Sequence, residues 1–185
     1  MQNTLGIFED RKEEINFYYS IMIEIESAEG RIETIDNNRL IKIMKSNLLL
    51  MLYNLVEACV VSGMMEIYED LKNDGCSYSD IHNIWAKHEI NEIYGPTTER
   101  SAYESRVQRI IQNIISGSPI MLSRDALGIS GNLNAKKIKE ICDRHRIRYR
   151  LETRGESLER VKLERNNLAH GDVSFSDCAR NLSLG

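Results

Sequence analysis

Apolar residues recur every three or four positions along most of the chain, the spacing of the buried face of an amphipathic helix. A glycine or a polar cluster interrupts each run where a helix would end. The pattern predicts helices over about residues 8–29, 39–72, 98–115, 134–142 and 157–168. Two further helices are expected to begin at Ser77 or Ser79 and at Ser176, and Asn134 and Ser157 are the expected N-caps of the last two helices above.

The segment 39–72 is apolar on nearly all sides, which is typical of a helix buried in a bundle. Asn47, Asn54 and Glu57 interrupt the apolar run before it reaches the ~20 residues of a membrane span, so no membrane is expected. These three polar residues fall on one helical face. Because a buried polar group needs a partner, we expect them to bridge neighbouring helices or to orient functional side chains.

The fold class predicted from these patterns is all-α. Residues 146–151 alternate between basic and apolar side chains, as in a strand with one charged face, so at most a short strand or hairpin is expected there or at 120–122. The 185 residues form one expected domain. Its core would comprise about 8–72 and 134–185, with an inserted helical segment at about 73–133.

Composition excludes several kinds of protein. The chain is 42% hydrophobic and 28% charged, as in ordinary globular proteins. Its four cysteines are scattered, and its first residues lack a signal-peptide pattern, so we expect a reduced, cytoplasmic protein. Cys142 and His145 have metal-ligand spacing without a second pair, so neither a metal nor another cofactor is expected. The glycine-rich nucleotide-binding motifs do not occur.

Charge is distributed unevenly along the chain. Residues 1–100 carry nine Lys or Arg and eighteen Asp or Glu, whereas residues 134–165 carry eleven basic and six acidic side chains. A basic segment of this kind is either a solvated face or the electrostatic footprint of a nucleic-acid site. The candidate RNA-binding residues in it are Lys136, Lys137, Arg146, Arg148 and Arg150.

The strongest chemical candidate is the stretch 164–172. It contains Arg165, Asn166 and His170, and Gly171 comes directly after the histidine. Arginine binds phosphate oxygens in pairs, and histidine exchanges protons near neutral pH. On a straight helix five residues separate two side chains by ~140° and ~7.5 Å along the axis. Either the helix ends at Gly171 and His170 leaves the helical path, or the arginine of one copy works with the histidine of another.

Four residues separate Arg165 from His170, and the first of them is the polar Asn166. This motif resembles the signature of the HEPN superfamily of helical ribonucleases. Two further segments, Ser46–Ala58 and Ser130–Leu133, are similar to its MAE-type branch, which is found among bacterial defence and toxin-like genes. The resemblance covers roughly residues 40–180.

The resemblance implies a helical bundle, usually dimeric, whose two motifs face each other across the interface. It implies a metal-independent endoribonuclease in which Arg165 holds the scissile phosphate and His170 is the general acid or base. The RNA 2′-OH would attack and leave a cyclic phosphate, with Asn166 supporting the site. Expected partners are RNA, a second copy, and an antitoxin or neighbouring defence protein.

Two other interpretations remain open at the level of sequence. The family also contains members that only bind, so the chain could be a catalytically inactive helical module that binds RNA or a partner protein. A purely structural helical subunit is the third interpretation, and it predicts no salt-dependent RNA affinity. The assignment of Asn54, Glu57 and Asn47 as groups that support Arg165 or His170 comes from the polar face alone.

Overall fold

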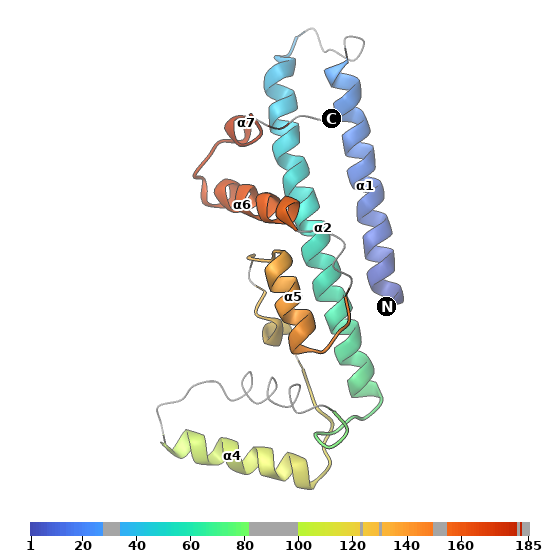
Figure 1. Ribbon diagram of the computed structural model, residues 1–185, viewed down its shortest axis with the longest axis vertical. Helices are drawn as coiled ribbons and strands as arrows, with labels where there is room; N and C mark the ends of the chain where they lie inside the picture. Colours follow the sequence, from blue (N-terminus) through green and yellow to red (C-terminus); the bar gives the residue numbers. More distant parts are fainter. Residues whose placement is uncertain are drawn as a thin grey trace. The chain divides into compact units, whose positions relative to one another are not determined.

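The computed structural model describes residues 1–27, 34–81, 100–122, 124–129, 131–149, 155–180 and 182. Over these residues the chain is all-α, as predicted, and contains no strand; Ser77 and Pro119 form an isolated bridge. The helices are α1 (Gln2–Glu26), α2 (Asn37–Asn73), α4 (Arg100–Ile115), α5 (Ala135–Arg144), α6 (Glu156–His170) and α7 (Phe175–Cys178), with a 3₁₀ turn η1 at Arg124–Leu127 (Figure 1).

The structure confirms one of the predicted helix starts and corrects two others. Asn134 caps α5 as predicted, since its side-chain oxygen accepts from the Lys137 backbone N–H at 2.8 Å. The prediction of Ser157 as a cap is wrong: α6 follows Gly155, which has φ 76° and gives no side-chain cap. Likewise α7 begins after Ser174, not at Ser176. The helix expected beyond Ser77 falls mostly on residues 82–99, outside the described residues.

The strand predicted at 146–151 is not formed at 146–149; residues 150 and 151 lie outside the described residues. Arg146 has φ 53° and stands at the end of α5. Its backbone N–H bonds to the Asp143 carbonyl, and that of Ile147 bonds to the Cys142 carbonyl. These two bonds close a Schellman motif. The alternating pattern therefore marks a helix terminus.

Contacts divide the chain into two compact units. The first comprises residues 1, 61–130 and 138–150, and the second comprises 2–60, 131–137 and 151–185. Helices α2 and α5 contribute to both. The single domain with a core of about 8–72 and 134–185 and an insertion at about 73–133 stays a prediction.

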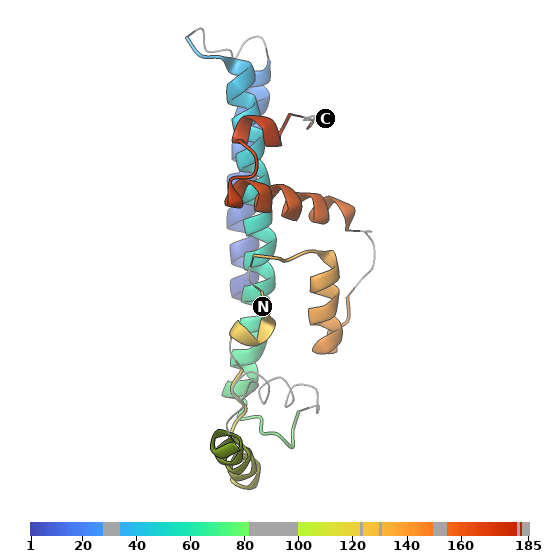
Figure 2. The ribbon, with the colours of Figure 1, turned by 90° about the vertical axis from the view of Figure 1, so that its left-hand side faces the viewer.

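In the second unit α1 lies alongside the first part of α2 (Figures 1 and 2). Its core contains Met22 of α1, Met44, Leu49 and Tyr53 of α2, and Leu168 of α6. Buried Ser46 of α2 donates to the Phe175 carbonyl at 2.6 Å, which attaches the start of α7. This unit contains the candidate catalytic stretch 164–172.

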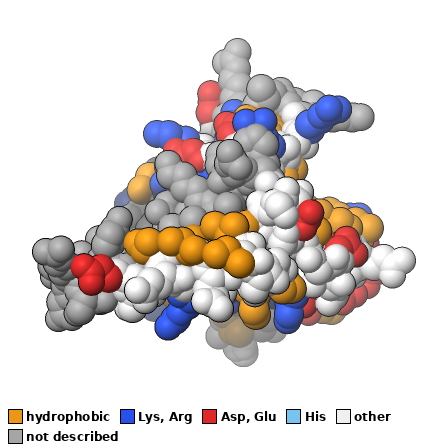
Figure 3. Space-filling model, turned by 90° about the horizontal axis from the view of Figure 1, so that it is seen from below, with side chains coloured by type: hydrophobic (Ala, Val, Ile, Leu, Met, Phe, Trp, Pro, Cys, Tyr) orange, Lys and Arg blue, Asp and Glu red, His pale blue; other side chains and the backbone are white. Residues whose placement is uncertain are grey.

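The first unit buries Met64 and Tyr68 of α2, with Ile120, Leu127 and Ile141. One side of α4 is apolar and exposed, at Ile111, Ile114 and Ile115, and Figure 3 shows hydrophobic side chains gathered along it. Among the described helices, α2 is long and apolar enough to cross a membrane. Core helices of soluble proteins share these properties, so this finding assigns no membrane.

Candidate functional site

Arg165 projects from α6 onto an aromatic side chain of α2. Its Cζ lies 4.9 Å from the centroid of the Tyr53 ring, within the range of a cation–π contact. Tyr53 is 1% exposed, and Arg165 is half-buried. The ring is therefore a fixed surface against which the guanidinium rests.

The loop before α5 lies on another side of the same guanidinium. The Leu133 backbone N–H donates to the Tyr53 hydroxyl at 3.0 Å, and Arg165 Nη1 approaches the Gly131 carbonyl oxygen at 3.5 Å. Gly131 has φ 71°, and a Cβ built on it would be 2.9 Å from Arg165 Nη1. The positive φ therefore favours glycine, and a larger side chain at this position would displace the guanidinium.

Asn166 supplies the remaining contact. Its Oδ1 accepts from Arg165 Nη1 at 3.0 Å, and its Nδ2 makes a long contact of 3.4 Å to Asn132 Oδ1. The residue after the arginine thus connects the guanidinium to the 131–133 loop. The described groups that contact Arg165, namely the Tyr53 ring, the Gly131 carbonyl and the Asn166 amide, are uncharged.

A guanidinium has five N–H donors. Nη1 is engaged by Asn166 and Gly131, whereas Nε and Nη2 have no hydrogen-bond acceptor among the described residues. Within that part of the chain no carboxylate forms an ion pair with Arg165. Within the described residues Arg165 is therefore a positioned cation without a neutralising carboxylate, and its Nε and Nη2 edge can bind two oxygens of an anion.

The Tyr53 hydroxyl is held as a neutral phenol. Burial raises the pKa of Tyr53 most strongly, the bond from Leu133 lowers it, and nearby Glu57 raises it. Glu57 itself has a buried Oε2 that lacks a hydrogen-bond partner within the described chain. Of the three polar residues predicted to support the site, Glu57 is the one that the structure brings beside Tyr53.

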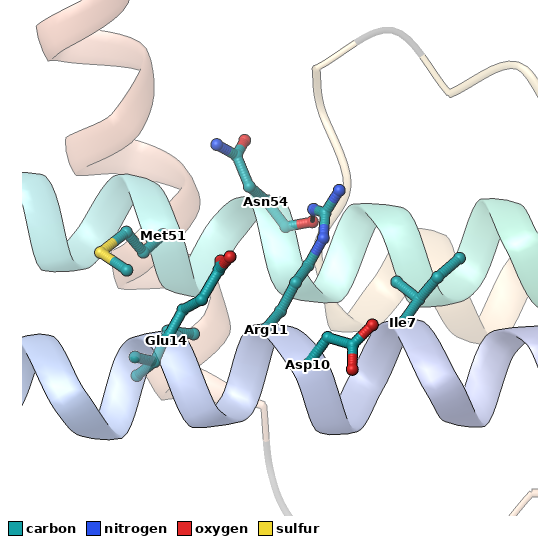
Figure 4. A pocket seen from close by; sticks show the side chains of 7 residues that line it. Ile7, Asp10, Arg11, Glu14, Met51 and Asn54 are labelled. Carbon is teal, nitrogen blue, oxygen red and sulfur yellow. Dashed lines mark hydrogen bonds between the residues drawn. The ribbon is translucent and has the colours of Figure 1, made fainter.

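The other two polar residues lie towards α1. Asn47 bonds to Tyr18, and the Asn54 backbone oxygen accepts from Arg11 Nη1 at 2.8 Å. Asn54 lines a groove of about 460 Å³ between α1 and α2, together with Arg11 and two acidic side chains (Figure 4). Neither asparagine is among the described residues that contact Arg165, and their supporting role stays a prediction.

His170 is exposed and is the last residue of α6, directly before Gly171 with φ 76°. The helix does end at Gly171, as predicted, but His170 has not left the helical path. The ~140° and ~7.5 Å between positions five apart on a helix therefore apply to their backbone positions. The contribution of a second copy, the other alternative, stays a prediction.

The five candidate RNA-binding residues divide between the units. Lys136 is exposed and Lys137 half-buried in the second unit, while Arg146 and Arg148 are exposed in the first. Arg150 lies outside the described residues. In the part of the chain that is described, no group of three or more His, Cys, Asp or Glu could hold a metal ion.

The site includes residues that sequence analysis did not single out as functional: Tyr53, Gly131, Asn132 and Leu133. A weak signal was available, because all four fall within the segments whose sequence carried the family resemblance. The contacts of Tyr53 and Gly131 with Arg165, and those of Leu133 with Tyr53 and of Asn132 with Asn166, had no signal in helical spacing.

Comparison with known proteins gives one result. A family model described as HEPN_MAE_28990-like HEPN matches residues 3–183. No curated protein matches, and no solved structure does.

Proposed function

The chain belongs to the HEPN_MAE_28990-like HEPN family, a nuclease-like or defence-related module, and on that premise we propose that it is a metal-independent endoribonuclease of a bacterial defence or toxin-like system. The proposal places it in the cytoplasm, where RNA is available. Its main support is the state of Arg165, a half-buried guanidinium held by neutral groups with its Nε and Nη2 free of described partners.

In the proposed reaction, Arg165 binds two non-bridging oxygens of the scissile phosphate. The RNA 2′-OH loses its proton to a base and attacks phosphorus, and the P–O5′ bond breaks as an acid protonates the leaving oxygen. The products are a 2′,3′-cyclic phosphate and a 5′-hydroxyl. Negative charge on the phosphoryl oxygens increases in the transition state, so the guanidinium binds that state more tightly than the substrate.

The reaction needs one base and one acid, and a homodimer would supply two copies of His170. HEPN domains commonly bind RNA and form dimers. Leu163 is 54% exposed and precedes His170 by seven residues, so both lie on one face of α6. An exposed leucine about two turns from the proposed catalytic histidine, on the same face of α6, favours cover of that face by a second copy.

The test is cleavage of total RNA by purified protein in excess EDTA, with cyclic phosphate ends as the product. Arg165→Ala should lower kcat/KM by about 10²–10³-fold, the cost of removing a transition-state donor. Arg160→Ala removes an exposed arginine from the same helix and is the matched control, with less than about threefold expected loss. Cleavage that requires a metal, or that survives Arg165→Ala, would contradict the mechanism.

A second candidate function is binding of RNA without cleavage. It is favoured by His170, which has no hydrogen-bond partner among the described residues to orient it. In that case Arg165→Ala leaves RNA affinity unchanged, whereas Arg146→Ala with Arg148→Ala lowers the affinity and reduces its salt dependence. Absence of cyclic phosphate ends, with salt-dependent affinity retained, would identify this function.

A further inference from the structure

We propose that Tyr53 is the positioning residue of this site: its ring fixes the plane of the Arg165 guanidinium, and its hydroxyl fixes the loop that sets the guanidinium's direction. The inference rests on the proposed function, since it assigns a residue that aligns Arg165 for the phosphate. Tyr53 would touch no reacting atom and would act through Arg165.

The ring carries the first part of the inference. A free arginine side chain loses rotamer entropy when it is ordered on a substrate. The cation–π contact with the Tyr53 ring, 4.9 Å from Cζ to the centroid, favours one arrangement of the side chain beforehand. Tyr53 is 1% exposed in the core of the second unit, so its ring cannot follow a moving guanidinium. Arg165 is therefore ordered before any RNA arrives.

The hydroxyl carries the second part. It accepts from the backbone N–H of Leu133, a residue without solvent exposure. That bond holds the two residues before Leu133: the Gly131 carbonyl faces Nη1, and the Asn132 side chain contacts Asn166. The Gly131 carbonyl and Asn166 occupy Nη1, and among the described residues nothing accepts from Nε or Nη2, which leaves them for the phosphate. One tyrosine thus fixes both the plane and the direction of Arg165.

Gly131 gives an independent way to disturb the same geometry. A methyl group there would lie 2.9 Å from Nη1 and 3.3 Å from Nη2, so the guanidinium would have to move. Gly131→Ala leaves Tyr53, Asn166 and Arg165 unchanged in sequence. If the position of Arg165 matters, Gly131→Ala and a Tyr53 variant should produce the same kinetic defect.

A purely structural tyrosine makes different predictions. It would lower stability without changing the turnover of folded protein, whichever side chain replaced it. A positioning tyrosine predicts a lower kcat at nearly unchanged KM, partly rescued by phenylalanine, which keeps the ring but loses the Leu133 bond. The split between kcat and KM separates the two roles.

The experiment measures kcat and KM of wild type, Tyr53→Leu, Tyr53→Phe, Gly131→Ala and Arg165→Ala, each at a temperature where circular dichroism shows the helical fold. A reacting group displaced by ~1 Å costs about 10²-fold in rate, so Tyr53→Leu and Gly131→Ala should lower kcat by about 10–100-fold with KM within about threefold. Tyr53→Phe should lose less than about tenfold. If Tyr53→Leu does not fold, Gly131→Ala decides the kinetic test.

The possible failures are distinguishable. Folded Tyr53→Leu or Gly131→Ala with wild-type kcat, beside an inactive Arg165→Ala, overturns the positioning role and leaves the nuclease assignment intact. If the wild type does not cleave RNA, the proposed function fails, and ¹⁵N relaxation of the Arg165 Nε–H without RNA decides the inference. A rigid wild-type signal that becomes mobile in Tyr53→Phe or Gly131→Ala supports it, and equal mobility overturns it.

Discussion

Helices α5 and α6 end in the same backbone motif, and each places a histidine just before the left-handed residue. His145 precedes Arg146 with φ 53°, and His170 precedes Gly171 with φ 76°. In both motifs, the backbone N–H of the residue with positive φ donates to the carbonyl three residues earlier. The N–H of the next residue donates to the carbonyl five residues before it. The local backbone therefore does not distinguish the two imidazoles.

Their surroundings do distinguish them. His145 is 3% exposed; its Nδ1 donates to the Ile141 carbonyl at 2.8 Å, and its Nε2 accepts from the Tyr68 hydroxyl at 2.9 Å. Both ring nitrogens are used, in the neutral form of the ring. His170 is exposed, with no hydrogen-bond partner within the described chain. Burial makes one histidine a structural cap and leaves the other available for proton transfer.

The two buried tyrosines of α2 repeat this contrast. Tyr68 contacts His145, and Tyr53 contacts Arg165. The Tyr68 contact completes the hydrogen bonding of its partner, whereas Tyr53 leaves part of the guanidinium unused. A candidate functional group is therefore recognised by the donors that its neighbours leave free.

The largest expected effect is that alanine at one histidine lowers activity, whereas alanine at the other lowers stability. His170→Ala should lower the RNA cleavage rate by about 10²–10⁴-fold, the usual contribution of a general acid or base. His145→Ala should instead lower the free energy of unfolding by about 1–3 kcal/mol, because the Tyr68 hydroxyl loses its buried partner. Cleavage assays and urea unfolding on both variants measure this. A His145→Ala protein that is stable but inactive would contradict the comparison.

A smaller effect is expected from pH. Burial, and secondarily the Arg144 charge, hold the pKa of His145 below its ordinary 6.5, while the Ile141 bond opposes this. Below pH 6.5 the unfolded chain binds a proton that the folded protein does not, so stability present above pH 6.5 is lost as pH falls. The slope for one proton is at most about 1.4 kcal/mol per pH unit. Urea unfolding between pH 5 and 7.5 should show this slope in wild type and less of it in His145→Gln; equal slopes would exclude His145 as the cause.

The smallest effect on the free energy of unfolding is expected from substitutions at the two residues with positive φ, Arg146 and Gly171. Arg146→Gly should raise the free energy of unfolding by up to about 1 kcal/mol, because glycine adopts positive φ without strain. Gly171→Ala should lower it by about 1 kcal/mol for the opposite reason. Thermal unfolding compares the two variants, with Asp172→Ala as the control. Equal signs would show that φ does not govern these positions.

Helical periodicity predicted the described helices because each buried face is a local property of the chain. It mistook 146–149 for a strand because an arginine with positive φ has no sequence signal. Arg165, Asn166 and His170 could be proposed from the sequence because the motif is contiguous, and their catalytic roles stay predictions. Gly131 and Tyr53 were missed as site residues because they act through contacts 34 and 80 positions apart along the chain, Arg165–Gly131 and Tyr53–Leu133.

The bare α-carbon at Gly131 also bears on how the protein could be switched off by evolution or by design. A single methyl there would fill the volume that the charge now occupies, without altering a motif residue or an ionisable group. A relative that keeps the arginine and the histidine of the motif but carries a larger amino acid at this position would then be expected to lack RNA cleavage activity.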